Sequence, residues 1–93
     1  MEAASMKAIK KPILVDVWQL DNYDIHMAPA WVREAMSTNG GLRYRDEGDY
    51  WVVRTLEGSM FATNGDYLIK GVKGELYPCR KDIFEDSYNV FGR

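Results

Sequence analysis

From Leu42 onward, glycine-containing turns divide the sequence into short runs of strand-forming residues. The runs YWVVRTL (50–56) and MFAT (60–63) alternate or cluster β-branched and aromatic side chains in the way that strands do. Asn64-Gly65, which follows MFAT, is the strongest hairpin signal, because Asn-Gly accepts the positive φ angles of a type I′ turn. This half of the chain is therefore expected to form a small antiparallel sheet.

A second hairpin is predicted immediately afterwards. The run YLIKGV (67–72) leads through a turn at Lys73-Gly74 into ELYPC (75–79). Pro78 has no N–H group to donate to a neighbouring strand, so it places the last run at a sheet edge or at a local break.

The remaining segments predict one further strand and two helical stretches. KKPILVDVWQLD (10–21) reads as a first strand with apolar residues on both faces. APAWVREAMSTNGG (28–41) predicts a helix over 29–38, with an apolar stripe at helical spacing and an Asn-Gly-Gly terminator. NYDIHM (22–27) fits either an extra helical turn or a loop. KDIFEDSY (81–88) predicts one or two helical turns at the end of the domain.

These elements define the expected fold class, α+β. We expect one small domain over residues 6–93: a curled antiparallel sheet of four to six strands, or a partly open barrel, with one packed α-helix and a short C-terminal helical turn. Residues 1–5 are expected to be a disordered leader. The predicted core comprises Val15, Val17, Trp31, Val32, Ala35, Val53, Ile69 and Phe84.

Composition and charge narrow the classes of partner. The 93-residue chain has a net charge of −2, so its overall field favours neither sequence-specific nucleic acid nor an anionic membrane. The longest apolar run is ILV (13–15), far short of the roughly 20 residues that a membrane span needs. Cys79 is the single cysteine and has no disulfide partner within the chain, which favours a reducing, cytoplasmic location.

Catalytic and metal-binding patterns have little support in the sequence. His26 is the only histidine, lies in an irregular segment and is best read as a surface or helix-entry residue. Arg80 and Lys81 could lower the pKa of Cys79, yet a cysteine in a strand is more often a small buried hydrophobic residue. Zinc would need further thiolates or histidines. We expect no enzymatic activity, no metal and no cofactor.

The stretch 65–84 carries more positive charge than a hairpin needs. Lys70, Lys73, Arg80 and Lys81 fall within twelve residues and interleave with tyrosines. Cations beside aromatic rings can hold a small anion with an attached base, although a solvated face balanced by nearby carboxylates explains the same charges. The candidate ligand-binding residues are Trp18, Gln19, Lys70, Gly71, Lys73, Gly74, Tyr77 and Arg80, the two glycines being expected to bring backbone N–H groups close to phosphate.

Two parts of the chain resemble one family. TLEG (55–58), followed by GDYLIKGVKGELYPCRKDIF (65–84), resembles small proteins of tailed phages and prophages that are grouped as PGDYG-type proteins. KKPILVDVWQL (10–20) is similar to the opening strand of that family, which ends in an aromatic-Gln pair. The sequence departs from the naming motif at Asn64, where the family usually has proline, and at Leu68, where the name has glycine.

The resemblance implies a phage-encoded accessory protein that acts in the bacterial cytoplasm during infection or from a prophage. Phage proteins of this size commonly bind host components, including defence systems, and some are oligomers that sequester nucleotide signals. We therefore expect a homo-oligomer that sequesters an anionic, nucleotide-like ligand in counter-defence. The alternatives are an inhibitor or adaptor that binds a host or phage protein, and an accessory protein with a structural role. Interface hot spots use the same Tyr, Trp and Arg residues.

Overall fold

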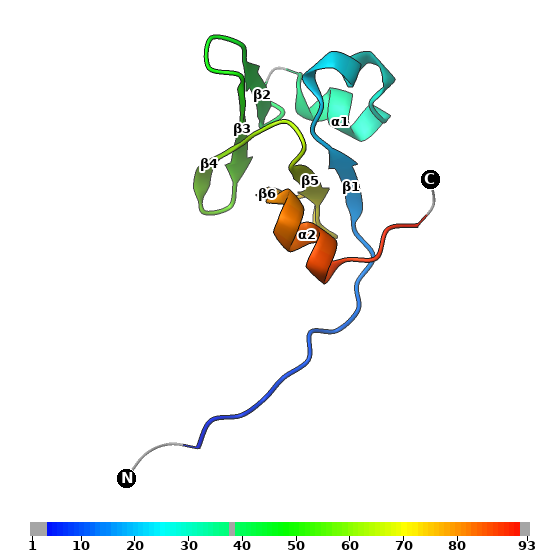
Figure 1. Cartoon of the computed structure of the whole chain (residues 1–93), viewed down its shortest axis with the longest axis vertical. Coiled ribbons are helices and arrows are strands. Elements are labelled where there is room, and N and C mark those ends of the chain that lie inside the picture. The colour runs from blue at the N-terminus through cyan, green and yellow to red at the C-terminus, as the bar shows by residue number, and fades with distance from the viewer. Residues whose placement is uncertain (1–3, 38, 92–93) are drawn as a thin grey trace.

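The computed structural model describes residues 4–37 and 39–91, and it has the expected α+β class. Six strands form two separate three-stranded antiparallel sheets, neither of which closes into a barrel (Figure 1). The first sheet contains β1 (Asp16–Gln19), β5 (Tyr67–Lys70) and β6 (Leu76–Cys79), and the second contains β2 (Leu42–Arg45), β3 (Tyr50–Thr55) and β4 (Gly58–Ala62). The helical elements are the 3-10 helix η1 (Asn22–Met27), α1 (Ala30–Ala35) and α2 (Lys81–Ser87).

The hairpin predicted at Asn64-Gly65 is wrong, because this turn joins two strands of different sheets. Strand β4 pairs only with β3, whereas β5 lies between β1 and β6. The turn has positive φ at Gly65 alone, so it is not of type I′. Leu68 and Ile69 of β5 are both fully buried. A strand covered on both faces fits the centre of a sheet, where both of its edges are hydrogen-bonded, better than the end of a hairpin.

The first strand is much shorter than the predicted run over 10–21. The ladder between β1 and β5 begins at the pair Asp16–Lys70, and the chain turns immediately after Lys70, which leaves earlier residues without a partner strand. Residues 4–15 run away from the folded body without regular structure (Figure 1). The radius of gyration is 15.3 Å, against about 12 Å for a compact domain of this length. The leader predicted over 1–5 falls largely on residues 1–3, outside the described ones.

The predicted helix over 29–38 is present but shorter, and residue 38 lies outside the described residues. Pro29 is the extended N-cap of α1, and the helix ends at Ala35. Asn39 then adopts a φ of +68°, and the N–H of Gly40 donates to the carbonyl of Ser37 at 2.8 Å. The helix therefore ends about one turn before these terminator residues, and Gly40 packs against the carbonyl of Ala35. The ambiguous segment NYDIHM forms η1.

The main core lies between the inner faces of the two sheets and is closed on one side by α1. Trp51 and Val53 of β3 are fully buried and face Leu68 of β5, and Val32 of α1 packs against them. Trp18 meets Trp51 edge to face, with ring centroids 6.0 Å apart. Of the predicted core, Val32, Ala35, Val53, Ile69 and Phe84 are buried, whereas Val15, Val17 and Trp31 are only half-buried.

Helix α2 covers the other face of the β1–β5–β6 sheet. The buried ring of Phe84 stacks on Tyr67 of β5 at a centroid distance of 3.8 Å and on Tyr88 at 4.7 Å. Ile69 is fully buried on the same face as Tyr67. The layers therefore run α2, first sheet, second sheet, and no helix of the described residues covers the outer face of the second sheet (Figure 1).

Asn64 ties three elements together through its side chain. Its Oδ1 accepts hydrogen bonds from Trp51 Nε1 at 2.8 Å and from the backbone N–H of Asn22 at 3.0 Å. Its Nδ2 donates to Asp49 Oδ1 at 3.0 Å. The asparagine at this position, where the resembling family usually has proline, therefore has a structural role that a proline cannot take.

Replacing Asn64 with alanine is expected to lower the free energy of unfolding by about 1–3 kcal/mol, because the buried indole N–H of Trp51 loses its acceptor. Urea denaturation followed by circular dichroism measures the loss. Asn89→Ala is the matched control, since Asn89 is exposed and makes no such contact in the described residues. Equal stability of Asn64→Ala and the parent chain would contradict this role.

Candidate functional site

The predicted ligand-binding residues do not come together. Pairing of β5 with β6 sets Lys70 opposite Leu76 and Ile69 opposite Tyr77. Because neighbouring residues of a strand point to opposite faces, Lys70 and Tyr77 lie on opposite sides of the sheet. Lys70 of β5 lies opposite Asp16 of β1, a cross-strand neighbour of opposite charge. A cradle that uses both Lys70 and Tyr77 is therefore not formed within this sheet.

The glycines of the turn serve the turn itself. The N–H of Gly71 donates to the carbonyl of Glu75 at 2.8 Å, and the N–H of Gly74 donates to the carbonyl of Gly71 at 3.0 Å. The N–H of Lys73 donates to the carboxylate of Glu75 at 3.0 Å. These backbone donors were expected to approach phosphate, but the carboxylate of Glu75 already occupies the position that an anion would take.

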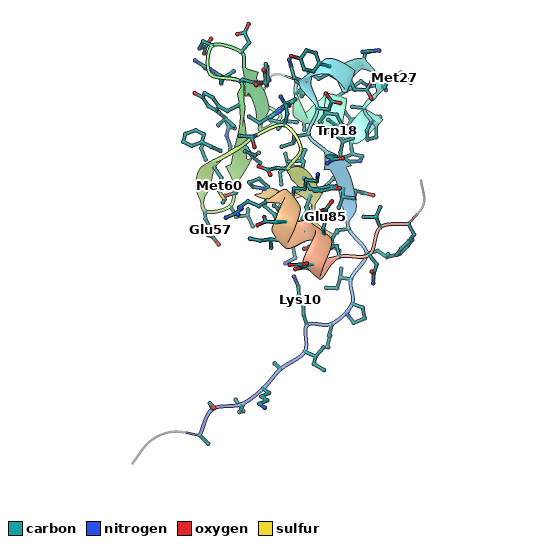
Figure 2. The ribbon with its side chains drawn as sticks, in the orientation of Figure 1. Lys10, Trp18, Met27, Glu57, Met60 and Glu85 are labelled. Atoms are coloured by element: carbon teal, nitrogen blue, oxygen red, sulfur yellow. The ribbon has the colours of Figure 1, made fainter. Side chains whose placement is uncertain are left out.

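Three other predicted residues have structural partners. Arg80 is exposed and pairs with Asp82 at 2.8 Å. Trp18 lies against the core, where it contacts Trp51, and points into the folded body (Figure 2). Gln19 Nε2 donates to the carbonyl of Gly65 at 3.0 Å. These contacts agree with the alternative interpretation, a solvated face whose charges are balanced locally.

Two ionisable side chains of this sheet, Tyr77 and Cys79, have raised pKa values. Burial, together with the neighbouring Tyr88 hydroxyl, raises the pKa of Tyr77 to about 12. Burial also raises the pKa of the Cys79 thiol, and the negative charges of Asp66 and Asp82 raise it further. The effect of the neighbouring cations Arg80 and Lys81 on the thiol, considered from the sequence, is outweighed. Cys79 stays a protonated thiol at neutral pH, which makes it a poor nucleophile.

Cations do converge elsewhere, in a hollow of about 740 Å³ that follows the free edge of β2. We call it the arginine hollow. Arg43 and Arg45 of β2 and Arg54 of β3 line it. None of its described lining residues carries a carboxylate. The full lining is Asn22, Ile25, Met36, Ser37, Asn39, Gly40, Gly41, Leu42, Arg43, Tyr44, Arg45, Val52, Arg54 and Ser59.

Strand geometry explains why the arginines share one side. Leu42 faces the core, so Arg43 and Arg45, at alternate spacing from it, face outward. Arg54 neighbours the buried Val53 and therefore also faces outward, opposite Ser59 of β4. The loop after α1 lies beside this face and contributes polar side chains and two glycines.

The hollow also has apolar lining residues, and the positive charge of its arginines is only partly compensated. Ile25, Met36 and Val52 are half-buried and supply a surface for a ring or a sugar. Arg45 pairs with Glu47 at 2.9 Å, whereas Arg43 and Arg54 are exposed and have no carboxylate within 4.0 Å among the described residues. Tyr44 donates to Asp49, and this hydrogen bond raises the pKa of Tyr44 to about 12.

Sequence reasoning missed this site although a signal was present. The alternation in LRYR (42–45) and the arginine of YWVVRT (50–55) mark one outward face once the two runs are paired. The neighbouring acidic turn DEGD (46–49) hides the local excess of positive charge when charge is counted along the chain. The pairing register separates Arg43 and Arg54 from those carboxylates, whereas Arg45 pairs with Glu47.

A smaller hollow of about 230 Å³ adjoins the first one. Arg54 lines both, and Gly74, Glu75 and Leu76 close the far side of the second. Gly74 is therefore the single residue of the predicted ligand-binding set that lies near the arginine hollow. It sits beside a carboxylate, so the second hollow is less suited to anions than the first.

Within residues 4–37 and 39–91, no group of three or more His, Cys, Asp or Glu side chains is placed to hold a metal ion. No helix in the same ranges is long and apolar enough to cross a membrane. Comparisons of the chain with models of known protein families, with curated proteins and with solved structures find no match. The family resemblance carried by residues 10–20 and 55–84 therefore stays a prediction.

Proposed function

We propose that this chain is an accessory binding protein that sequesters a small anionic, nucleotide-like ligand in the arginine hollow. The observation that carries the proposal is the convergence of Arg43, Arg45 and Arg54 on one hollow whose described lining contains no carboxylate. Guanidinium groups bind phosphate through paired hydrogen bonds, and they keep their charge at every physiological pH.

The size and lining of the hollow support a ligand with both an anionic and a flat apolar part. Its volume of about 740 Å³ falls in the range of small-molecule sites. Ile25, Met36 and Val52 offer the apolar surface, while Asn22 and Ser37 offer hydrogen-bonding groups at the rim. A nucleotide presents phosphate, sugar and base in that order of decreasing charge.

The biological setting that we propose is the one implied by the resemblance. A phage or prophage protein of this kind would act in the host cytoplasm, and removing a nucleotide signal from solution would serve counter-defence. Sequestration needs binding without turnover, which fits a site built from arginines and a protein whose only thiol has a raised pKa.

Isothermal titration calorimetry with cyclic di- and trinucleotides and with ADP-ribose tests the proposal. Arg43→Ala combined with Arg54→Ala is expected to weaken binding about 100-fold, since each lost charge-assisted hydrogen bond contributes about 1.5 kcal/mol. Lys73→Ala combined with Arg80→Ala is the matched control and should bind like the parent chain. Equal losses in both double variants, or no heat with any of these ligands, would overturn the proposal.

A second candidate function, binding of a host or phage protein, is favoured by one feature of the β3–β4 hairpin. Leu56, Met60 and Phe61 are 87%, 46% and 71% exposed. Figure 2 shows Met60 and Glu57 at the exposed end of this hairpin, away from the core. Large exposed apolar side chains on one hairpin suit a protein partner. A chain that binds no nucleotide but is captured by a partner through Phe61 would have this function instead.

A further inference from the structure

The N-terminal arm, residues 4–15, exposes apolar side chains that the folded body does not use. Met6, Ile9, Ile13 and Leu14 are 93%, 95%, 56% and 74% exposed, although they directly precede a strand of the sheet. Isolated exposed hydrophobic residues are ordinary, but four within nine residues give this segment a concentration of exposed apolar side chains. Such a segment gains free energy when another surface covers it.

The same arm is uniformly basic. Lys7, Lys10 and Lys11 are exposed, and between Ala4 and Val15 there is no acidic residue. None of these lysines forms a salt bridge in the part of the chain that the structure describes. The arm therefore presents positive charge and apolar side chains together, and a surface that receives it should present carboxylates beside an apolar residue.

The last turn of α2 presents that combination. Glu85 and Asp86 are exposed, have no partner cation within 4.0 Å among the described residues, and lie next to the 51% exposed Ile83. No basic residue occupies this turn. Carboxylates at a helix C-terminus face the negative end of the helix dipole, so an external cation would relieve an unfavourable arrangement there.

We infer that the arm of one copy docks on the α2 surface of a second copy, with Lys10 and Lys11 against Glu85 and Asp86 and Ile13 against Ile83. Lys10 lies on the arm and Glu85 on α2 (Figure 2). The exchange is reciprocal in a twofold dimer, so each copy gives one arm and receives one. This interface is independent of the arginine hollow and leaves that hollow accessible.

The course of the arm favours a second copy over the chain's own helix. Its twelve residues span about 40 Å when extended, so they can reach beyond the folded body. The arm also runs outward from the start of β1 (Figure 1).

Charge reversal on each side of the interface gives a direct test. Lys10→Glu with Lys11→Glu makes one variant, and Glu85→Lys with Asp86→Lys makes the other. Light scattering coupled to size-exclusion chromatography over increasing protein concentration is expected to show a dimer for the parent chain. Each variant alone should dissociate at least about tenfold more readily, because like charges then face one another in both contacts.

Mixing the two variants should restore the dimer, since each mixed pair then joins opposite charges at both contacts. Docking of an arm on its own helix cannot produce that rescue. Lys73→Glu with Glu57→Lys is the control and should dimerise like the parent chain, because both residues are exposed and belong neither to the arm nor to α2. A monomeric parent chain, unchanged dimerisation of the variants, or failure of the mixture to associate would each overturn the inference.

Discussion

Replacing Trp51 with alanine is expected to cost about 3–5 kcal/mol of unfolding free energy, the largest effect of any single substitution that we predict. Trp51 is fully buried and contacts the rings of Trp18 and Tyr44. Its indole N–H donates to Asn64, so the change also removes the donor that anchors the turn between the two sheets. Small domains have only about 5–15 kcal/mol of total unfolding free energy, so a large fraction of the variant molecules would be unfolded near body temperature.

Urea denaturation followed by far-ultraviolet circular dichroism measures this loss without depending on tryptophan emission. Trp31→Ala is the matched control, because Trp31 loses the same atoms from a half-buried position at the edge of the core. It should lose markedly less stability than Trp51→Ala. Similar losses in the two variants would mean that the core between the sheets does not centre on Trp51.

Local pattern was sufficient to predict the elements of the second sheet. The predicted run YWVVRTL (50–56) forms β3, which pairs with β2 in the register Leu42–Val53. Alternation places Val53 in the core because every second residue of β3 points inward. The hairpin between β5 and β6, with Pro78 on an edge strand, follows from equally local signals.

Which strands pair with one another could not be predicted from the local sequence pattern. Asn64-Gly65 is a strong turn signal, yet the strands it joins bury their apolar faces in different sheets. The side chain of Asn64 bonds with Trp51 and Asn22, contacts that are distant in sequence. A turn propensity describes only the backbone of its own residues, so tertiary contacts of this kind can redirect the chain without changing the turn.

For a related reason, the sequence did not reveal which positively charged side chains lie together in space. The charges of Lys70, Lys73 and Arg80 are close in sequence, but alternation across β5 and β6 and the course of the turn separate them. The arginines of the hollow are up to eleven positions apart and meet only through the pairing of Arg43 with Val52, beside Arg54. The spacing of charged residues along one strand can be predicted from the sequence. Their convergence from two strands can be predicted only when the pairing register is known.

Gly40 links the end of α1 to the arginine hollow and gives the second large prediction. A Cβ at this position would meet the backbone carbonyl oxygen of Ala35, and it would stand 2.5 Å from that of Glu34. Backbone carbonyls at the end of a helix cannot move aside as a flexible side chain can. Gly40→Ala is therefore expected to cost about 3 kcal/mol of unfolding free energy.

Gly71→Ala separates this backbone effect from simple crowding. A Cβ at Gly71 would also overlap a neighbour, but that neighbour is the carboxylate of Glu75, which can rotate away. Gly71→Ala should therefore lose less than about 1 kcal/mol of unfolding free energy, the size of one weakened hydrogen bond. Chemical denaturation of both variants decides the point. Because Gly40 lines the hollow, Gly40→Ala should also weaken nucleotide binding at temperatures where it remains folded, whereas Gly71→Ala should bind like the parent chain. A Gly40→Ala variant as stable as Gly71→Ala would show that the loop after α1 can relax, and that it does not hold the arginine hollow in shape.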